Sequence, residues 1–260
     1  MSMKKVIFFL VVATGLMAAP VGNPSFPKLI EKGFFIPPDV WLNLRFGYEG
    51  DFVTDAKLEQ ASNLPVDCYR QETNSGTFTM NILERLDIYT LLGSSRTRAD
   101  WRFEAPEGTQ RIELETGYDF LWGLGARGIL FEWKGATLGL GGRYEHASYD
   151  PVWLTVNGTV ESARGTKLRW REWQVDLDLS YKIDIFSPYI GVKYSSVRAK
   201  AGNFQTTISV NGTGSNQFTN HTPVGVFIGC SLTTGRYFML NVEGRLVDEE
   251  AVTISGDVRF

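Results

Sequence analysis

The residues of this chain that could carry out chemistry are few and lie far apart. Gly123, Gly125 and Gly128 have the spacing of a dinucleotide-binding fingerprint, but that motif needs a following helix whose N-terminus faces the pyrophosphate. Here a short apolar run and a Lys-Gly turn follow instead, so we interpret these glycines as making room in a strand. The two histidines, His146 and His221, lie on distant segments. The sequence therefore predicts no catalytic residue and no enzyme.

Neither a metal site nor a cofactor is predicted. Asp248, Glu249 and Glu250 are adjacent acids that could bind a cation, but a solvated turn is the favoured interpretation. Cys68 and Cys230 are the two cysteines, which is too few for a disulfide scaffold. The formal net charge of −3 would fall to −5 on loss of the two lysines near the N-terminus, and this balance argues against nucleic acid as a partner.

Most charged residues alternate with apolar residues at a period of two. The run 173–183 shows the pattern clearly, with Trp, Val, Leu, Leu, Tyr and Ile at the odd positions and mostly charged or polar residues between them. Successive side chains of a strand point to opposite faces, and outer-membrane barrels turn the apolar face to lipid and the polar face to the lumen. The predicted pore-lining residues are eight basic and eight acidic side chains. They are Arg45, Arg85, Arg127, Arg143, Lys182, Lys193, Arg245, Arg259, Glu49, Asp87, Asp119, Glu145, Asp176, Asp178, Glu243 and Asp257.

These charges predict a narrow polar channel with a field across it. Arg127 and Arg143 flank one short turn, so we expect them on neighbouring strands as one basic side of a constriction. Asp176 and Asp178 are the predicted acidic side opposite. Such side chains tune ion passage, while the balance of signs gives no reason for strong selectivity. A barrel of this size can also be filled by its side chains, so a closed lumen remains the alternative.

The elements that would position these residues are strands. The predicted fold class is all-β, an antiparallel transmembrane outer-membrane β-barrel of about ten strands, within a range of eight to twelve. Short turns alternate with longer connections such as 54–75, as expected for periplasmic turns and outer loops. The short turns are predicted near 93–96, 134–135, 184–188 and 233–236.

Two local signals refine the strand pattern. Asn157-Gly158 and Asn211-Gly212 each predict a type I′ hairpin tip, because both central residues of that turn need a positive φ. Leu168 and Trp170 have the opposite parity to Trp173, so a β-bulge is expected near Glu172.

The two ends of the chain predict its compartment. Residues 1–18 have a basic start, an apolar stretch and small residues at the end, which is typical of a cleaved signal peptide. Residues 19–39 are rich in Pro and Gly and are predicted as a periplasmic non-strand lead-in, followed by the transmembrane barrel at 40–260. The terminal Phe260 closes a period-two strand and is the predicted assembly signal, read by the barrel assembly machinery, because an open sheet edge is not viable in lipid.

Short sequence blocks spread over most of the chain match, in order, those of a known family. The blocks are Pro20–Pro24, Gly50–Val53, Leu83–Ile88, Thr90–Gly93, Gly125–Arg127, Ala136–Gly139, Glu172–Gln174, Leu179–Tyr181, Ser187–Lys193, Arg245–Glu249 and Arg259–Phe260. Together they resemble the chlamydial-type major outer membrane porins. The chain differs from typical members in being much shorter and poor in cysteine.

The resemblance implies a porin of the bacterial cell outer membrane with a structural role in the envelope. Its expected partners are outer-membrane lipid, the barrel assembly machinery, and the ions and small solutes that pass through it. The alternative is a closed-lumen structural or adhesive barrel without significant transport. The sequence leaves open the ion selectivity, homo-oligomerisation, and intermolecular disulfides of Cys68 or Cys230.

Overall fold

The computed structural model describes residues 19–37, 40–60, 64–105, 108–202 and 216–260. The predicted signal peptide and the Asn211-Gly212 pair lie outside the described residues.

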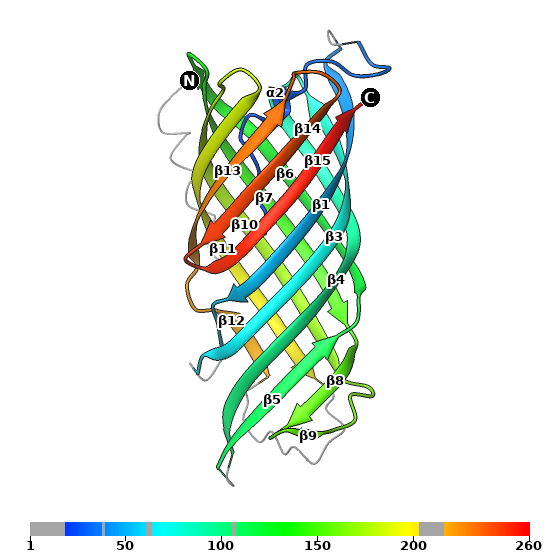
Figure 1. Cartoon of the computed structure of the whole chain (residues 1–260), viewed down its shortest axis with the longest axis vertical. Helices are drawn as coiled ribbons and strands as arrows, with labels where there is room; N and C mark the ends of the chain where they lie inside the picture. The colour runs from blue at the N-terminus through cyan, green and yellow to red at the C-terminus, as the bar shows by residue number, and fades with distance from the viewer. Residues whose placement is uncertain (1–18, 38–39, 61–63, 106–107, 203–215) are drawn as a thin grey trace, which may run out of the picture.

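The described chain forms a closed antiparallel barrel (Figure 1), and its ring contains ten strands by their pairing. Each barrel strand pairs with the next along the chain, and the last pairs with the first. The predicted fold class is therefore confirmed. The barrel strands are β1 (Leu42–Ala56), β3 (Val66–Ile82), β4 (Leu86–Ala105), β6 (Asp119–Trp133), β7 (Ala136–Tyr149), β10 (Lys167–Tyr181), β11 (Phe186–Gly202), β13 (Val224–Thr233), β14 (Phe238–Leu246) and β15 (Glu249–Arg259).

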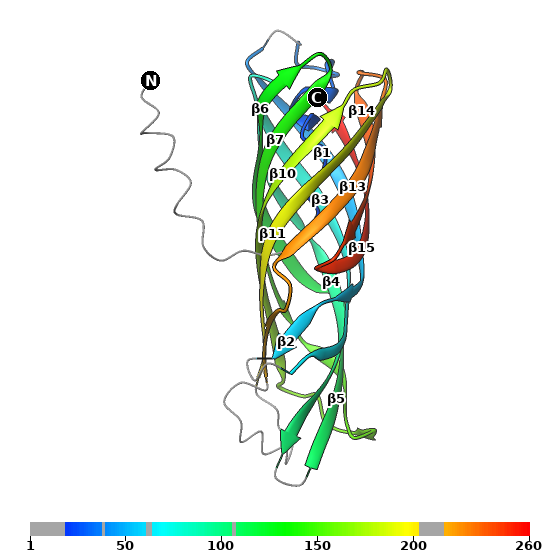
Figure 2. The same ribbon diagram turned by 90° about the vertical axis from the view of Figure 1, so that its left-hand side faces the viewer.

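The two ends of the barrel differ. At one end, the lower end in Figures 1 and 2, several strands run on and pair with short additional strands. The opposite end carries short turns, the C-terminus and the four-residue helix α2 (Phe26–Leu29). We call the first end the long-loop end and the second the short-turn end. The additional strands are β2 (Leu58–Gln60), β5 (Gly108–Thr116), β8 (Pro151–Val156), β9 (Thr159–Val160) and β12 (Gln217–Asn220).

Of three local predictions about loops and turns, two are wrong and one is confirmed. The predicted loop 54–75 is mostly strand, because β3 begins at Val66 and continues the sheet beyond the ring. The predicted turn at 93–96 lies inside β4, and the short turn falls at 83–85 instead. The Asn157-Gly158 prediction is confirmed, since the two residues have φ of 51° and 79° between β8 and β9, the positive pair that a type I′ turn requires.

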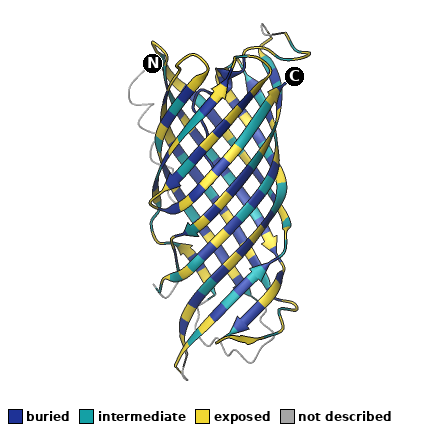
Figure 3. Ribbon diagram, in the orientation of Figure 1, coloured by how far each residue is buried: buried dark blue, intermediate teal, exposed yellow. Residues whose placement is uncertain are grey.

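Burial in this molecule is the inverse of that in a soluble protein. Leu177 and Leu179 are exposed, whereas Asp176 and Asp178 between them are buried. Figure 3 shows the alternation of exposed and buried residues along the strands. An apolar outer face is stable only when something other than water covers it, and in a membrane barrel that cover is lipid.

The change of parity at Leu168 and Trp170 comes from their surroundings and not from a bulge. Strand β10 shows no register shift against either neighbour, so the expected bulge near Glu172 is wrong. Both side chains are buried inside the sheet, in an apolar cluster built where the strands extend past the ring. Tyr69 stacks on Trp170 there, with ring centroids 4.8 Å apart. The apolar residues therefore mark a change of environment along one regular strand.

Candidate functional site in the barrel lumen

Residues 19–31, here called the inner segment, lie inside the ring of strands. The backbone N–H groups of Val21 and Gly22 donate to the Glu243 carboxylate at 3.0 and 2.7 Å. The Asn23 side chain donates to the Ser187 carbonyl at 2.9 Å and to the Ser231 hydroxyl at 3.1 Å. A lead-in at the periplasmic side was predicted, but buried backbone polar groups need partners, and this segment finds them on the lumen wall.

Barrel arginines bind the carbonyl groups of the inner segment. Arg127 donates to the Val21 carbonyl at 2.6 Å, and its guanidinium lies 4.4 Å from the centroid of the Phe26 ring. Arg45 donates to the Phe26 carbonyl at 2.5 Å, and Arg259 donates to the Ile30 carbonyl. Hydrogen bonds from charged donors are roughly twice as strong as neutral ones, so these contacts anchor the segment along its length.

The inner segment also forms ion pairs with side chains at the short-turn end. Lys28 and Glu132 are 3.0 Å apart, and Lys182 and Glu31 are 3.2 Å apart. Each of these pairs includes a side chain that is more than half exposed. Exposed ion pairs contribute about 0–1 kcal/mol each, so the end of the segment is held more weakly than its buried part.

One arginine crosses the lumen. Arg143 on β7 donates to Glu49 on β1 at 2.6 Å, and these strands are nearly opposite in the ring. Arg143 also donates to Glu145 on its own strand at 2.6 Å. The prediction that Asp176 and Asp178 form the acidic side opposite is wrong: their strand β10 pairs directly with β7, so they share a wall with Arg143.

A second buried network lies nearer the long-loop end. The Arg245 guanidinium contacts Asp51 at 2.7 Å and Glu249 at 2.5 Å. Lys193 pairs with Glu249 and lies 3.1 Å from Asp248. Burying charges is costly unless they are paired, and here two cations contact three carboxylates, which come from two strands and a turn.

The predicted pore-lining residues fall into two groups. Eleven are buried on the inner face: Arg45, Asp87, Arg127, Arg143, Glu145, Asp176, Asp178, Lys193, Glu243, Arg245 and Arg259. Glu49 and Asp257 also face inward and are partly exposed. Arg85 and Lys182 are exposed in turns of the short-turn end, and Asp119 lies at the start of β6 at the other end. These three lie at the mouths rather than inside, because strand parity no longer fixes direction where a strand ends.

Sequence reasoning missed the neutral polar residues of the lumen. Gln174 accepts from the Ala19 backbone N–H and donates to the Pro20 carbonyl. Ser180 shares a 2.6 Å hydrogen bond with Ser25 of the inner segment. Both have the inward parity of Asp176 and Asp178, so the same alternation would have identified them.

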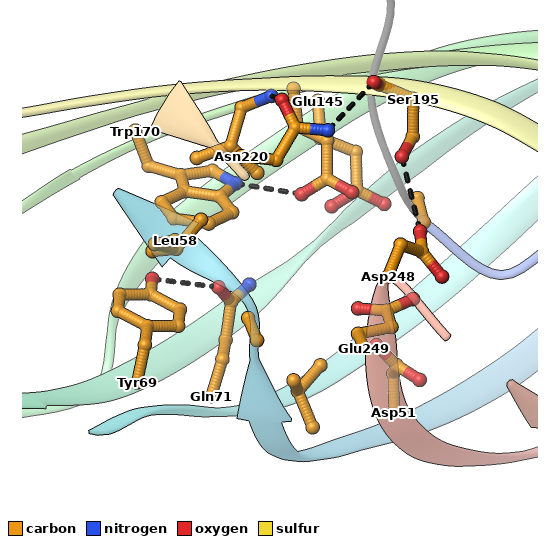
Figure 4. Close-up of a pocket in the computed structure, with 15 residues that line it drawn as sticks. Asp51, Leu58, Tyr69, Gln71, Glu145, Trp170, Ser195, Asn220, Asp248 and Glu249 are labelled. Carbon is orange, nitrogen blue, oxygen red and sulfur yellow. Dashed lines mark hydrogen bonds between the residues drawn. The ribbon is translucent and has the colours of Figure 1, made fainter. Parts of the chain in front are cut away.

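Cavities lie on both sides of the inner segment. A cavity of about 440 Å³ at the short-turn end is lined by Lys28, Leu29 and Glu31 together with turn residues. A smaller one of about 20 Å³, shown in Figure 4, lies beyond Ala19 and is bordered by Tyr69, Trp170, Glu145 and other inward side chains. That space suffices for about one water molecule. The segment therefore separates two cavities of one lumen.

The site offers ion pairs and hydrogen bonds rather than covalent or metal chemistry. Within the part of the chain that the structure describes, no group of three or more His, Cys, Asp and Glu side chains could hold a metal ion. Asp178 has both carboxylate oxygens buried without a hydrogen-bond partner, and Asp176 has one. The unpaired oxygen atoms of these acids and the charges of the nearby arginines can attract small ions of either sign.

Comparisons with known proteins agree with the predicted resemblance. Residues 152–209 match the family model described as Chlamydia major outer membrane protein. The chain is 26% identical to a major outer membrane porin of Chlamydia pneumoniae over 369 aligned positions, covering 94% of this chain and 95% of the relative. It is 24% identical to the serovar F major outer membrane porin of Chlamydia trachomatis, covering 95% and 96%. The resemblance to chlamydial major outer membrane porins is confirmed.

Solved outer-membrane proteins are also similar. One is an outer membrane channel from Pseudomonas putida F1, with 12% identity, a TM-score of 0.44, and coverage of 96% of this chain and 100% of that one. Another is the outer membrane protein OprG from Pseudomonas aeruginosa, with 11% identity, a TM-score of 0.37, and coverage of 89% and 99%.

Proposed function

We propose that this chain is an outer-membrane porin, a narrow passive diffusion channel for ions and small solutes with a structural role in the envelope. The observation that carries the proposal is the similarity to relatives named major outer membrane porin, which covers 94–95% of this chain and 95–96% of theirs. The closed barrel and its charged inner face provide the physical basis for it.

The pore-lining role belongs to the charged residues of the inner face, with Arg143 and Glu49 paired across the lumen. Their ion pair bridges β7 and β1, and the inner segment lies beside it, since Arg143 also donates to the Pro20 carbonyl at 3.4 Å. Because the side chains around the segment are nearly all buried, solutes pass only when the inner segment moves. Conduction is therefore small and intermittent.

The proposed location follows from the same premise. The signal segment directs export and is removed, and Phe260 on the terminal strand is read by the barrel assembly machinery. The short-turn end then faces the periplasm and the long-loop end faces outward, as in other barrels of this class. The proposed chemistry is passage alone, without a cofactor.

Conductance in planar bilayers tests this function. We expect the refolded mature protein to give small discrete current steps, and a variant lacking residues 20–31 to give larger ones, because its lumen loses the segment that separates the two cavities. Heat-modifiable gel migration shows for each sample that the barrel has folded. Folded protein that carries no current, with or without residues 20–31, would favour the closed-lumen structural barrel instead.

A further inference from the structure

Four cations lie together on the outward face of β10 and β11, which run side by side in Figure 2. Arg171 is in register with Arg198, and Arg169 is in register with Lys200. All four side chains are exposed. Like charges directly opposite each other destabilise a sheet, so this arrangement requires an explanation other than strand pairing. We call the four residues the basic patch.

The described residues do not neutralise the basic patch. None of its four cations forms an ion pair with a carboxylate of the described chain. The acids nearest in register are already engaged: Asp150 with Lys167 at 2.5 Å, and Glu59 with His221 at 2.8 Å. The connection that follows β11, residues 203–215, contains no Asp or Glu. The countercharge must therefore come from another molecule.

Three exposed arginines elsewhere on the outer face are neutralised by carboxylates of the chain itself. On β3, β4 and β5, Arg96 pairs with Glu72 at 2.8 Å and Arg102 pairs with Asp67 at 2.9 Å. Arg111 pairs with Asp100 and lies 3.0 Å from Glu113. These three arginines are exposed like those of the patch, yet each has a carboxylate, and we call them the paired face. Arg70 and Arg98, in register on β3 and β4, form no ion pair within the described residues, but they are one pair of cations, whereas the basic patch has two adjacent pairs.

The position of the basic patch indicates its ligand. On β10 the outward residues that follow Arg171 are Trp173, Val175, Leu177 and Leu179, and on β11 the outward Val192 and Tyr194 precede the cations. Aromatic residues gather where the hydrocarbon ends, so the cations lie at the level of the lipid headgroups. Phosphate is the anion found there, and the planar guanidinium binds it with two parallel hydrogen bonds.

We infer that Arg169, Arg171, Arg198 and Lys200 form a binding site for the phosphate groups of a phosphorylated glycolipid in the outer leaflet. The inference rests on the proposed outer-membrane location, which places the long-loop end in that leaflet. The lipid neutralises four like charges that the chain leaves unpaired, while its acyl chains cover the apolar face of the same two strands.

Binding of bis-phosphorylated lipid A in detergent micelles tests the site. We expect the folded wild type to bind this lipid and the variant R169Q/R171Q/R198Q to bind it at least about tenfold more weakly, since hydrogen bonds to charged groups are each worth about a factor of ten or more. The control is R96Q/R102Q/R111Q on the paired face. It loses the same number of charges and should change affinity by less than about twofold, because its arginines already have carboxylate partners.

Three results would overturn the inference. Equal binding of lipid A stripped of both phosphates would remove the phosphate from the interaction. Equal losses in the two triple variants would show a general effect of charge. Full competition by inorganic phosphate at the concentration of the lipid would identify a plain anion site. The assay needs no current, so a lack of conductance in bilayers leaves it intact, and failed lipid binding by a conducting protein refutes the site alone.

Discussion

Gly22 shows how closely a single residue can determine the state of the lumen. Its φ is 84°, in the region that glycine occupies without strain. A Cβ at this position would lie 2.8 Å from the Phe26 ring and 2.8 Å from the Arg127 guanidinium. Glycine therefore allows the inner segment to turn while its carbonyl groups and ring stay against Arg127.

Replacing Gly22 with Ala should loosen the inner segment and raise the mean conductance. The substitution adds both backbone strain and a clash at the Arg127 contact, whereas the strand pairing of the barrel is untouched. The matched control is Gly158→Ala in the β8–β9 turn, where φ is 79° and no atom lies within 4 Å of the added Cβ. Equal conductance of the two variants would refute a role for the Gly22 turn.

Arg245 contributes to stability rather than to the position of the inner segment, because it is fully buried among acids. Its loss as Arg245→Met would leave Asp51 and Glu249 with less countercharge in the lumen, which costs about 3–5 kcal/mol for a broken buried pair. We expect a marked drop in the urea midpoint of unfolding. Arg111→Met breaks an exposed pair and should cost about 0–1 kcal/mol. A similar midpoint for both variants would contradict the importance of the buried network.

Among the strands, β15 closes the ring by pairing with β1, and Phe260 holds the end of β15 against β1. The Phe260 backbone N–H donates to the Leu44 carbonyl at 3.0 Å. Its ring lies 5.5 Å from that of Phe46 on β1, edge to face, and 6.3 Å from that of Phe35. The terminal aromatic therefore contacts both the first strand and the chain that leads into it.

Deleting Phe260 should reduce the amount of folded barrel in the outer membrane severalfold, because the last strand loses its terminal contacts with the first. The measurement is the fraction of protein with heat-modifiable migration in isolated membranes. Phe120→Ala removes an exposed aromatic at the start of β6, far from the closure, and should leave that fraction nearly unchanged. Normal folded levels after deletion would count against the assembly role.

The strands were predictable from sequence and the inner segment was not. Alternation identified the inward face of β10 from Asp176 and Asp178 because lipid and lumen impose opposite polarities on neighbouring residues. The inner segment has no such period, and its burial depends on partners far away in sequence, such as Arg127 and Glu243. The apolar Phe26, Leu29 and Ile30 were the signal available, and they belong to one buried cluster.

The prediction that Asp176 and Asp178 lie opposite Arg127 and Arg143 was wrong for a similar reason. Alternation gives the face of a strand but not its place around the ring. Asp178 is on β10, and β10 pairs directly with β7, the strand of Arg143. Only the order of the strands around the ring could identify Glu49 as the partner of Arg143.

Over the whole molecule, the lumen combines charges of both signs, with six cations and nine acids buried among the described residues. Removing one sign should therefore give a measurable shift of reversal potential in a salt gradient. Arg127→Gln with Arg143→Gln should move it toward cations, and Asp176→Asn with Asp178→Asn should move it toward anions, because lumen residues tune selectivity. Shifts of the same direction in both variants would show that these residues do not line the path.

If solutes pass only when the inner segment moves, a reversible covalent link between this segment and the barrel should block the current. The Ser25 and Ser180 hydroxyl oxygens are 2.6 Å apart, so S25C/S180C in a C68S/C230S background should form a disulfide that fixes the segment to β10.

The measurement is single-channel conductance of that protein before and after addition of a reductant. We expect the oxidised protein to carry almost no current, and reduction to restore the current steps of the C68S/C230S protein. Oxidised channels that conduct as well as reduced ones would contradict it.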